Sequence, residues 1–224
     1  MSKPPLLIHI TKTAGTAISQ SGLAVPVRYQ YMKKENQQLE EMIGMDFQEM
    51  NPVSYKHIPY SYLDREAISR FDRKFAVVRN PWSRMVSLYN YADKVRELLP
   101  KNHAKNISKV SFNEFLDFRL KWTMFPSFYR ELPYNQWALQ MDWVIEKKNF
   151  KVDILRYENI NEDLSKYLNR NVELPIINKG SYKDDYKSYY NDETAQIVHD
   201  WFRLDIERWG FTFDSGATRN YWGS

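Results

Sequence analysis

The sequence lacks cysteine altogether, which excludes a disulfide framework, a thiolate metal site and a cysteine nucleophile. Glycine is scarce as well, with seven residues in a chain of 224. No apolar run approaches the roughly 20 residues of a membrane span, and the apolar segment near the N-terminus is too short for a signal peptide. We therefore expect a cytoplasmic protein without stable membrane insertion.

The charges are nearly balanced, with 32 Lys and Arg against 28 Asp and Glu and a net charge of +4. This mild excess suits a small anionic ligand and gives little reason to expect a nucleic-acid partner. No cluster of carboxylates or histidines has the spacing of a metal site, so we expect no metal. The length suits a single domain over residues 1–224.

Strand-like and helix-like segments alternate along the chain. This order predicts an α/β fold in which helices cover both faces of a parallel sheet. Ligands of such sheets bind at the carboxyl ends of the strands, which places Lys12, His57 and Arg79 along one edge. The expected strands cover residues 6–10, 53–57, 74–79 and 152–157, and the expected helices include 16–23, 60–71, a long helix from Pro81, one after a Ser111–Glu114 capping box, 134–147, one ending near Leu168, and 198–209 before a capping Gly210.

The turn after the first expected strand carries Lys12 among small residues. Small side chains let backbone amides approach an anion, and the start of the following helix adds a partial positive charge. Lys12 can reach a phosphate or sulfate oxygen, although the Gly-Lys-Ser/Thr ending of a Walker A loop is absent. The segment predicts an anion-binding loop, with an ordinary turn and a solvated lysine as the alternative.

Residues 9–17, His-Ile-Thr-Lys-Thr-Ala-Gly-Thr-Ala, resemble the 5′-phosphosulfate loop of sulfotransferases that use 3′-phosphoadenosine 5′-phosphosulfate (PAPS). The similarity is greatest to the branch that includes the Golgi carbohydrate sulfotransferases, whose loop has proline at the place of Thr11 and serine at that of Ala17. It implies a three-layer fold like that of P-loop nucleotide-binding proteins. It also implies that the donor is bound by Lys12, Thr13, Ala14, Gly15, Thr16 and Ala17.

Residues 77–89 resemble the 3′-phosphate motif of the same family. In that motif an arginine at a strand end and a serine eight residues later bind the phosphate, and Arg79 and Ser87 have this spacing. If Pro81 opens the helix, Ser87 lies about two turns along it and faces the strand end. A structural arginine paired with a carboxylate is the alternative for Arg79, and Arg84 is expected to position the loop.

The resemblance continues more weakly over residues 155–164 and 178–213. In the family, a basic loop before the last helix closes over the nucleotide. Lys179, Gly180 and Ser181 are the candidates for this contact, with a solvated basic loop as the alternative. Aromatic residues between 122 and 137 could bind the ring of an acceptor or belong to the core.

The reaction that the resemblance implies transfers a sulfuryl group from PAPS to an acceptor hydroxyl and leaves adenosine 3′,5′-bisphosphate (PAP). The acceptor would be a glycan, with lipids and small molecules as alternatives. Lys12 would stabilise the leaving phosphate, and His57 would be the general base because histidine titrates near neutral pH; an unidentified carboxylate is the alternative base. A nucleotide kinase and a non-catalytic PAP-binding module are the competing functions.

Overall fold

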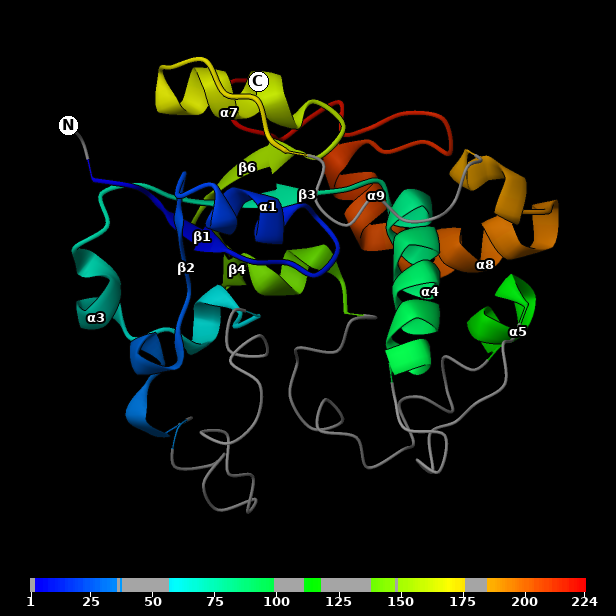
Figure 1. Cartoon of the computed structure of the whole chain (residues 1–224), viewed down its shortest axis with the longest axis horizontal. Helices are drawn as coiled ribbons and strands as arrows, with labels where there is room; N and C mark the ends of the chain where they lie inside the picture. Colours follow the sequence, from blue (N-terminus) through cyan, green and yellow to red (C-terminus); the bar gives the residue numbers. More distant parts are fainter. Residues whose placement is uncertain are drawn as a thin grey trace.

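The computed structural model describes residues 3–35, 37, 57–98, 111–117, 138–147, 149–175 and 185–224. Its centre is a four-stranded sheet in the order β2–β1–β3–β6, and every neighbouring pair is parallel (Figure 1). In the register, Ile8 pairs with Ala76 and Ala76 with Ile154. The strands are β1 (Leu6–Ile8), β2 (Val25–Pro26), β3 (Lys74–Val78) and β6 (Asp153–Arg156).

Alternate side chains of the strands enter two separate hydrophobic cores, as the period of two in a β-strand requires. On one face, Leu7 and Phe75 pack with residues of α1 (Gly15–Gln20) and α7 (Ile160–Leu168). On the other, Ile8 and Ala76 pack with residues of α4 (Pro81–Leu98). The sheet therefore lies between two helical layers, and the predicted α/β class with helices on both faces is confirmed.

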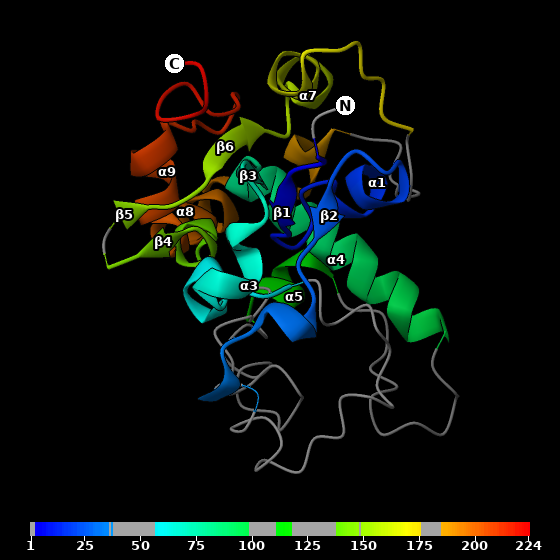
Figure 2. The ribbon, with the colours of Figure 1, turned by 90° about the vertical axis from the view of Figure 1, so that its left-hand side faces the viewer.

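The larger core also receives residues from α3 (Arg65–Ser69), α5 (Phe112–Asp117), α8 (Asp192–Trp201) and α9 (Arg203–Trp209). Figure 2 shows α7 above the strands and α3 below them. The described residues also contain a hairpin of β4 (Ile145–Glu146) and β5 (Asn149–Phe150) and the short 3-10 helices η1 (Tyr29–Tyr31), η3 (Tyr60–Tyr62), η4 (Gln140–Trp143) and η5 (Tyr186–Tyr189).

Several predicted elements differ from the observed ones. The helix expected over 60–71 is interrupted because Leu63 is extended and bridges Met32. The helix expected over 134–147 is wrong in its described part, which contains η4 and β4. The last helix is two helices, separated at the buried Phe202. Of the strand expected over 53–57, only His57 is described, and it lies in a loop.

Side-chain caps fix the ends of several helices. Asn80 caps α4, because its Oδ1 accepts hydrogen bonds from the amides of Trp82 (3.0 Å) and Ser83 (3.2 Å). The predicted capping box is confirmed, since the Ser111 and Glu114 side chains exchange bonds with each other's amides. Gly210 ends α9 with a φ of 66°, as expected of a helix terminator.

A partly buried ion pair joins β6 to α7. The Asp163 carboxylate accepts hydrogen bonds from the backbone amide of Arg156 (2.8 Å), its Nε (3.0 Å) and its Nη2 (2.6 Å). The ring of Tyr221, in the C-terminal segment, covers the guanidinium, whose carbon lies 4.1 Å from the ring centroid. Asp163 thus fixes the end of β6 and the first turn of α7 together.

We predict that Asp163→Ala lowers the free energy of unfolding by about 3 kcal/mol, because removing the carboxylate leaves the partly buried charge of Arg156 unpaired. Urea denaturation followed by circular dichroism measures the change. Glu162→Ala is the control: its exposed pair with Lys166 lies on the same helix, and its loss should leave the midpoint nearly unchanged. Equal midpoints for the two variants would contradict the role given to Asp163.

Candidate functional site

The turn after β1 has a backbone shape that non-glycine residues seldom adopt. Lys12 and Ala14 both have a φ of 66°, in the left-handed region. Between them, the buried Thr13 donates a hydrogen bond from its hydroxyl to the carbonyl of Ile10 at 2.9 Å. The turn is therefore closed from within by a side chain, and Lys12 is half-buried at its tip.

The first turn of α1 presents backbone amides without an internal partner. Ala14 occupies the N-cap position and provides no side-chain cap, and the first helical bond runs from the amide of Ile18 to the carbonyl of Ala14 at 3.1 Å. In the described part of the chain, no backbone bond uses the amides of Gly15, Thr16 and Ala17. Amides in this position are suited to bind an oxyanion.

Gly15 lies against the buried imidazole of His9. A Cβ atom at position 15 would lie 2.0 Å from Cδ2 of His9, far inside van der Waals contact. His9 is 3% exposed, so its ring has little room to move. Only glycine allows α1 to begin this close to the end of β1, because the buried His9 ring packs against its Cα, in line with the structural role expected of His9 from its place before the loop.

Arg79, directly after β3, joins the turn to α4. Its Nη1 donates a hydrogen bond to the carbonyl of Lys12 at 3.1 Å, while Nε and Nη2 both donate to the hydroxyl of Ser83, at 2.9 and 2.7 Å. The ring of Tyr157 lies 4.0 Å from the guanidinium carbon. A guanidinium has five N–H groups, of which these bonds use three, so within the described part of the chain two have no protein acceptor. Arg79 is 6% exposed.

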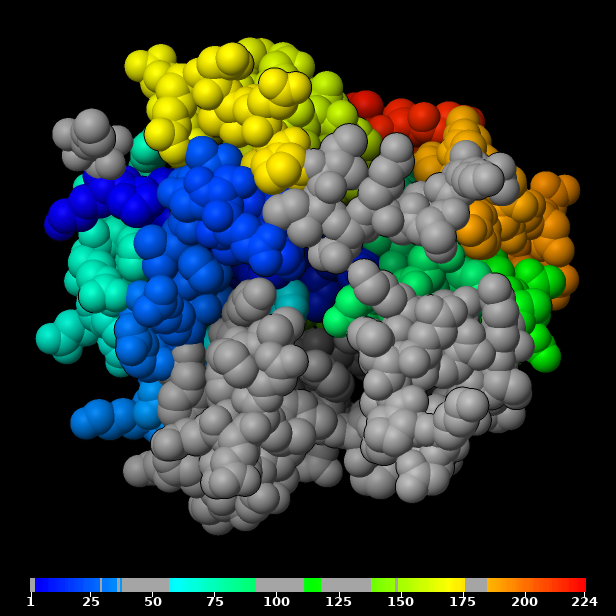
Figure 3. Space-filling view, viewed as in Figure 1, coloured from blue at the N-terminus to red at the C-terminus, as the bar shows by residue number. Residues whose placement is uncertain are grey.

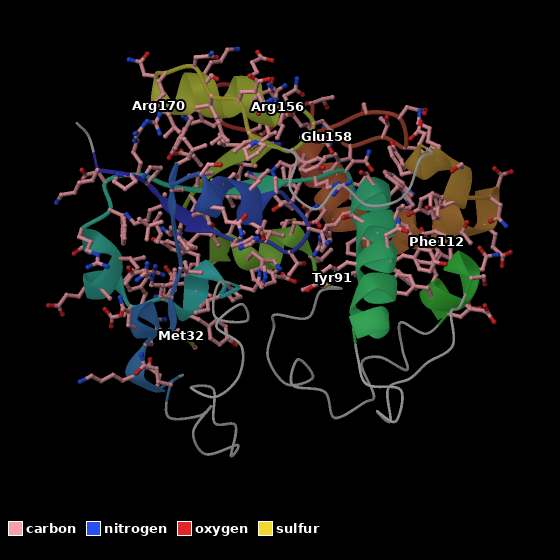
Figure 4. All side chains as sticks on the ribbon, in the orientation of Figure 1. Met32, Tyr91, Phe112, Arg156, Glu158 and Arg170 are labelled. Carbon is pink, nitrogen blue, oxygen red and sulfur yellow. The ribbon has the colours of Figure 1, made fainter. Side chains whose placement is uncertain are left out.

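One face of α4 lines this region. Ser83, Ser87 and Tyr91 are spaced four residues apart, so they lie on the same side of successive turns. The ammonium group of Lys12 lies over the ring of Tyr91, 4.0 Å from its centroid; Tyr91 is labelled in Figure 4. In the space-filling view, atoms of the N-terminal segment (blue) adjoin those of α4 (green) (Figure 3). Ser87 is half-buried and lies on this face of α4, between Ser83, which contacts Arg79, and Tyr91, which contacts Lys12.

Arg84 holds the beginning of the turn from beneath. Its Nε donates to the carbonyl of Thr11 and its Nη2 to the Thr11 hydroxyl, both at 3.2 Å, and its Nη1 donates to the carbonyl of Ala138 at 3.2 Å. The pKa of Arg84 is lowered to about 10, chiefly by burial; the nearby Asp205 opposes this shift and Arg79 adds to it. Burial likewise raises the pKa of Asp205 to about 6, against hydrogen bonds that favour its carboxylate. The bonds from Arg84 to Thr11 hold the residue that precedes Lys12, which fits the positioning role expected of Arg84.

His57 lies beside the end of β1. Its Nδ1 is 2.9 Å from the carbonyl of His9, and the two rings are 4.3 Å apart between centroids. Because a carbonyl only accepts, Nδ1 must carry the proton, which in the neutral ring leaves the lone pair on Nε2. The ring of Trp143 approaches His57 edge-on, at 6.2 Å between centroids. His57 is thus oriented by contacts on both sides.

The structure brings Lys12, Arg79 and His57 to one edge of the sheet. Arg79 bonds to the carbonyl of Lys12, and His57 bonds to the carbonyl of His9 at the end of β1. The sequence prediction did not include Ser83, which contacts Arg79; the i to i+4 spacing of Arg79 and Ser83 is the signal that could have shown this contact. The predicted closing residues Lys179, Gly180 and Ser181 and the aromatic residues between 122 and 137 lie outside the described ranges.

Among the residues that the structure describes, no group of three or more His, Asp or Glu side chains is arranged to hold a metal ion. No helix in those ranges combines the length and apolar character that a membrane crossing requires.

Comparison with known proteins identifies the family. A family model described as the sulfotransferase family matches residues 6–212, which is nearly the whole chain. The chain belongs to the sulfotransferase family. Comparisons with curated proteins and with solved structures gave no match. In this sulfotransferase the matched region contains both candidate loops, the sheet that carries them and α4.

We predict that Gly15→Ala lowers the free energy of unfolding by about 1–3 kcal/mol, the usual cost of inserting a methyl group into a packed site. Thermal and urea denaturation measure the loss. In a His9→Ala background the ring is gone, and the same change should cost much less. An equal cost in both backgrounds would show that the contact between Gly15 and His9 does not decide the residue at position 15.

Proposed function

We propose that this sulfotransferase transfers a sulfuryl group from PAPS to the hydroxyl of a carbohydrate acceptor. The observation that supports this most is the hydrogen bond from Arg79 to the Lys12 carbonyl. It joins two segments that, by their resemblance, would bind opposite ends of the same nucleotide: the 5′-phosphosulfate at residues 12–17 and the 3′-phosphate at Arg79. The parallel sheet with helices on both faces, and a loop with free amides after its first strand, also support a P-loop-like fold over a single domain, residues 1–224.

The hydrogen-bond donors and the positive charge of the turn after β1 fit a phosphosulfate. The amides of Gly15, Thr16 and Ala17 provide neutral donors at the start of α1, where a negative charge is favoured. Lys12, at the tip of the same turn, would provide the positive charge. Thr13 and Ala14 would shape the turn rather than contact the ligand through their side chains, since the Thr13 hydroxyl already bonds to Ile10.

The region around Arg79 fits a phosphate monoester. Two N–H groups of its guanidinium remain for oxygen acceptors, in the planar arrangement that phosphate accepts. Ser87, one turn after Ser83 on the same face of α4, would donate a further hydrogen bond. Lys179, Gly180 and Ser181 would then close over the bound nucleotide.

The transfer would proceed by in-line displacement. A bond forms between the acceptor oxygen and sulfur as the bond between sulfur and the bridging phosphate oxygen breaks, and PAP leaves with the electron pair. The acceptor proton passes to Nε2 of His57, whose other nitrogen is held by the His9 carbonyl. Lys12 stabilises the negative charge that develops on the leaving oxygen. A carboxylate base, and lipid or small-molecule acceptors, are the alternatives that experiment must distinguish.

We predict that the protein binds adenosine 3′,5′-bisphosphate in preference to ATP with Mg²⁺, and that Arg79→Ala weakens this binding at least about tenfold, because hydrogen bonds to charged groups contribute about 1.5–3 kcal/mol. Isothermal titration calorimetry measures both affinities. Arg203→Ala, which removes an exposed guanidinium on α9, should leave them unchanged. A preference for ATP with Mg²⁺ would instead indicate a phosphotransferase.

We predict that His57→Ala lowers the transfer rate at least about 100-fold, the scale of general-base catalysis, and leaves bisphosphate binding nearly intact. The assay follows labelled sulfate from PAPS to acceptors screened among glycans, lipids and small alcohols. His199→Ala is the matched control, because this histidine lies exposed on α8. Turnover retained in His57→Ala would assign the base to another group, and bisphosphate binding without any transfer in the wild type would indicate a binding module.

A further inference from the structure

The backbone amide and carbonyl of Arg79 lie past the last paired residues of β3. Strand pairing along β3 ends at Ala76 on the β1 side and at Val78 on the β6 side. Both polar groups of Arg79's main chain are instead bound by one carboxamide, that of Gln140. The Arg79 amide donates to Oε1 and Nε2 donates to the Arg79 carbonyl, each at 2.9 Å. The Gln140 side chain thus replaces a missing strand at the point where Arg79 leaves the sheet.

Gln140 is itself held by a buried carboxylate from a distant part of the chain. Asp205 on α9 accepts hydrogen bonds from the backbone amides of Gln140 (2.7 Å) and Met141 (3.0 Å). Both Gln140 and Asp205 are 0% exposed, so neither can exchange these bonds for water. The carboxamide is therefore presented to Arg79 from a fixed backbone.

The contacts around η4 form a closed ring. The Arg79 side chain bonds to the Lys12 carbonyl, Arg84 bonds to Thr11 one residue earlier, and the same Arg84 bonds to the carbonyl of Ala138, two residues before Gln140. At its other end, η4 places Trp143 against His57. A single short turn thus contacts the residue after β3 and the histidine beside β1.

We propose that Gln140 is a positioning residue of this sulfotransferase, whose carboxamide fixes the Arg79 peptide and so aims the guanidinium at the 3′-phosphate of the donor. This inference rests on the proposed function, because it assigns Arg79 to that phosphate. A residue that only stabilised the fold would affect all parts of the ligand alike. A residue that acts through Arg79 must affect the 3′-phosphate alone.

The test compares the effect of the substitution on two adenosine ligands, of which only one carries the 3′-phosphate. Affinities of the full chain for adenosine 3′,5′-bisphosphate and for adenosine 5′-phosphosulfate, which lacks the 3′-phosphate, are measured by calorimetry for the wild type and Gln140→Met. Methionine has a similar length and makes neither hydrogen bond. We expect about tenfold weaker binding of the bisphosphate, the scale of a lost buried hydrogen bond, and unchanged binding of the phosphosulfate. Met141→Leu, at the next residue, should change neither.

Each outcome decides between the proposals. Bisphosphate binding by the wild type with no loss in Gln140→Met, or an equal loss for both ligands, overturns the role of Gln140 and leaves the donor site standing. Absence of binding of either ligand by the wild type overturns both proposals. If melting curves show that Gln140→Met does not fold, Gln140→Glu carries the same test, because its carboxylate keeps the acceptor for the Arg79 amide and loses the donor for the carbonyl.

Discussion

The turn after β1 and the first turns of α4 are held together by one buried guanidinium, that of Arg79. A charge with so little access to water is costly unless its N–H groups find acceptors. The Lys12 carbonyl and the Ser83 hydroxyl provide them, and Tyr157 covers the guanidinium. The bond from Arg79 to the Lys12 carbonyl fixes the position of the turn after β1 relative to the end of β3. The next residue, Asn80, caps α4 and also donates from Nδ2 to two carbonyls of the C-terminal segment, so the same short stretch links four parts of the chain.

Local features of the sequence were enough to predict the centre of the fold. The apolar runs at 6–8 and 74–78 form adjacent parallel strands, the proline at 81 begins a long helix, and the glycine at 210 ends the last one. In each case the decisive information lies within a few residues: a run of buried side chains, a fixed φ, or a missing Cβ. The family was accessible for the same reason, since both of its motifs are short and continuous. The functional roles given to their residues remain predictions.

Contacts between distant residues could not be predicted in this way. Nothing near Gln140 indicates that its carboxamide pairs with a peptide 61 positions earlier, or that Asp205 would hold its backbone. Within residues 138–147, the described part of the helix expected over 134–147, these bonds fix η4 in its place, because a buried carboxylate binds two successive amides there. The strand Val25–Pro26 was missed since two residues carry no periodic pattern, and only pairing with β1 defines it.

We propose that the loop after β1 and the residues around Arg79 form one site for a nucleotide with phosphates at both ends. The decisive test is a crystal structure of the protein with adenosine 3′,5′-bisphosphate. We expect the 5′-phosphate against the amides of residues 15–17 with Lys12 close by, and the 3′-phosphate on the remaining N–H groups of Arg79 and the hydroxyl of Ser87. A nucleotide bound elsewhere, or one whose 3′-phosphate does not touch Arg79, would contradict the claim.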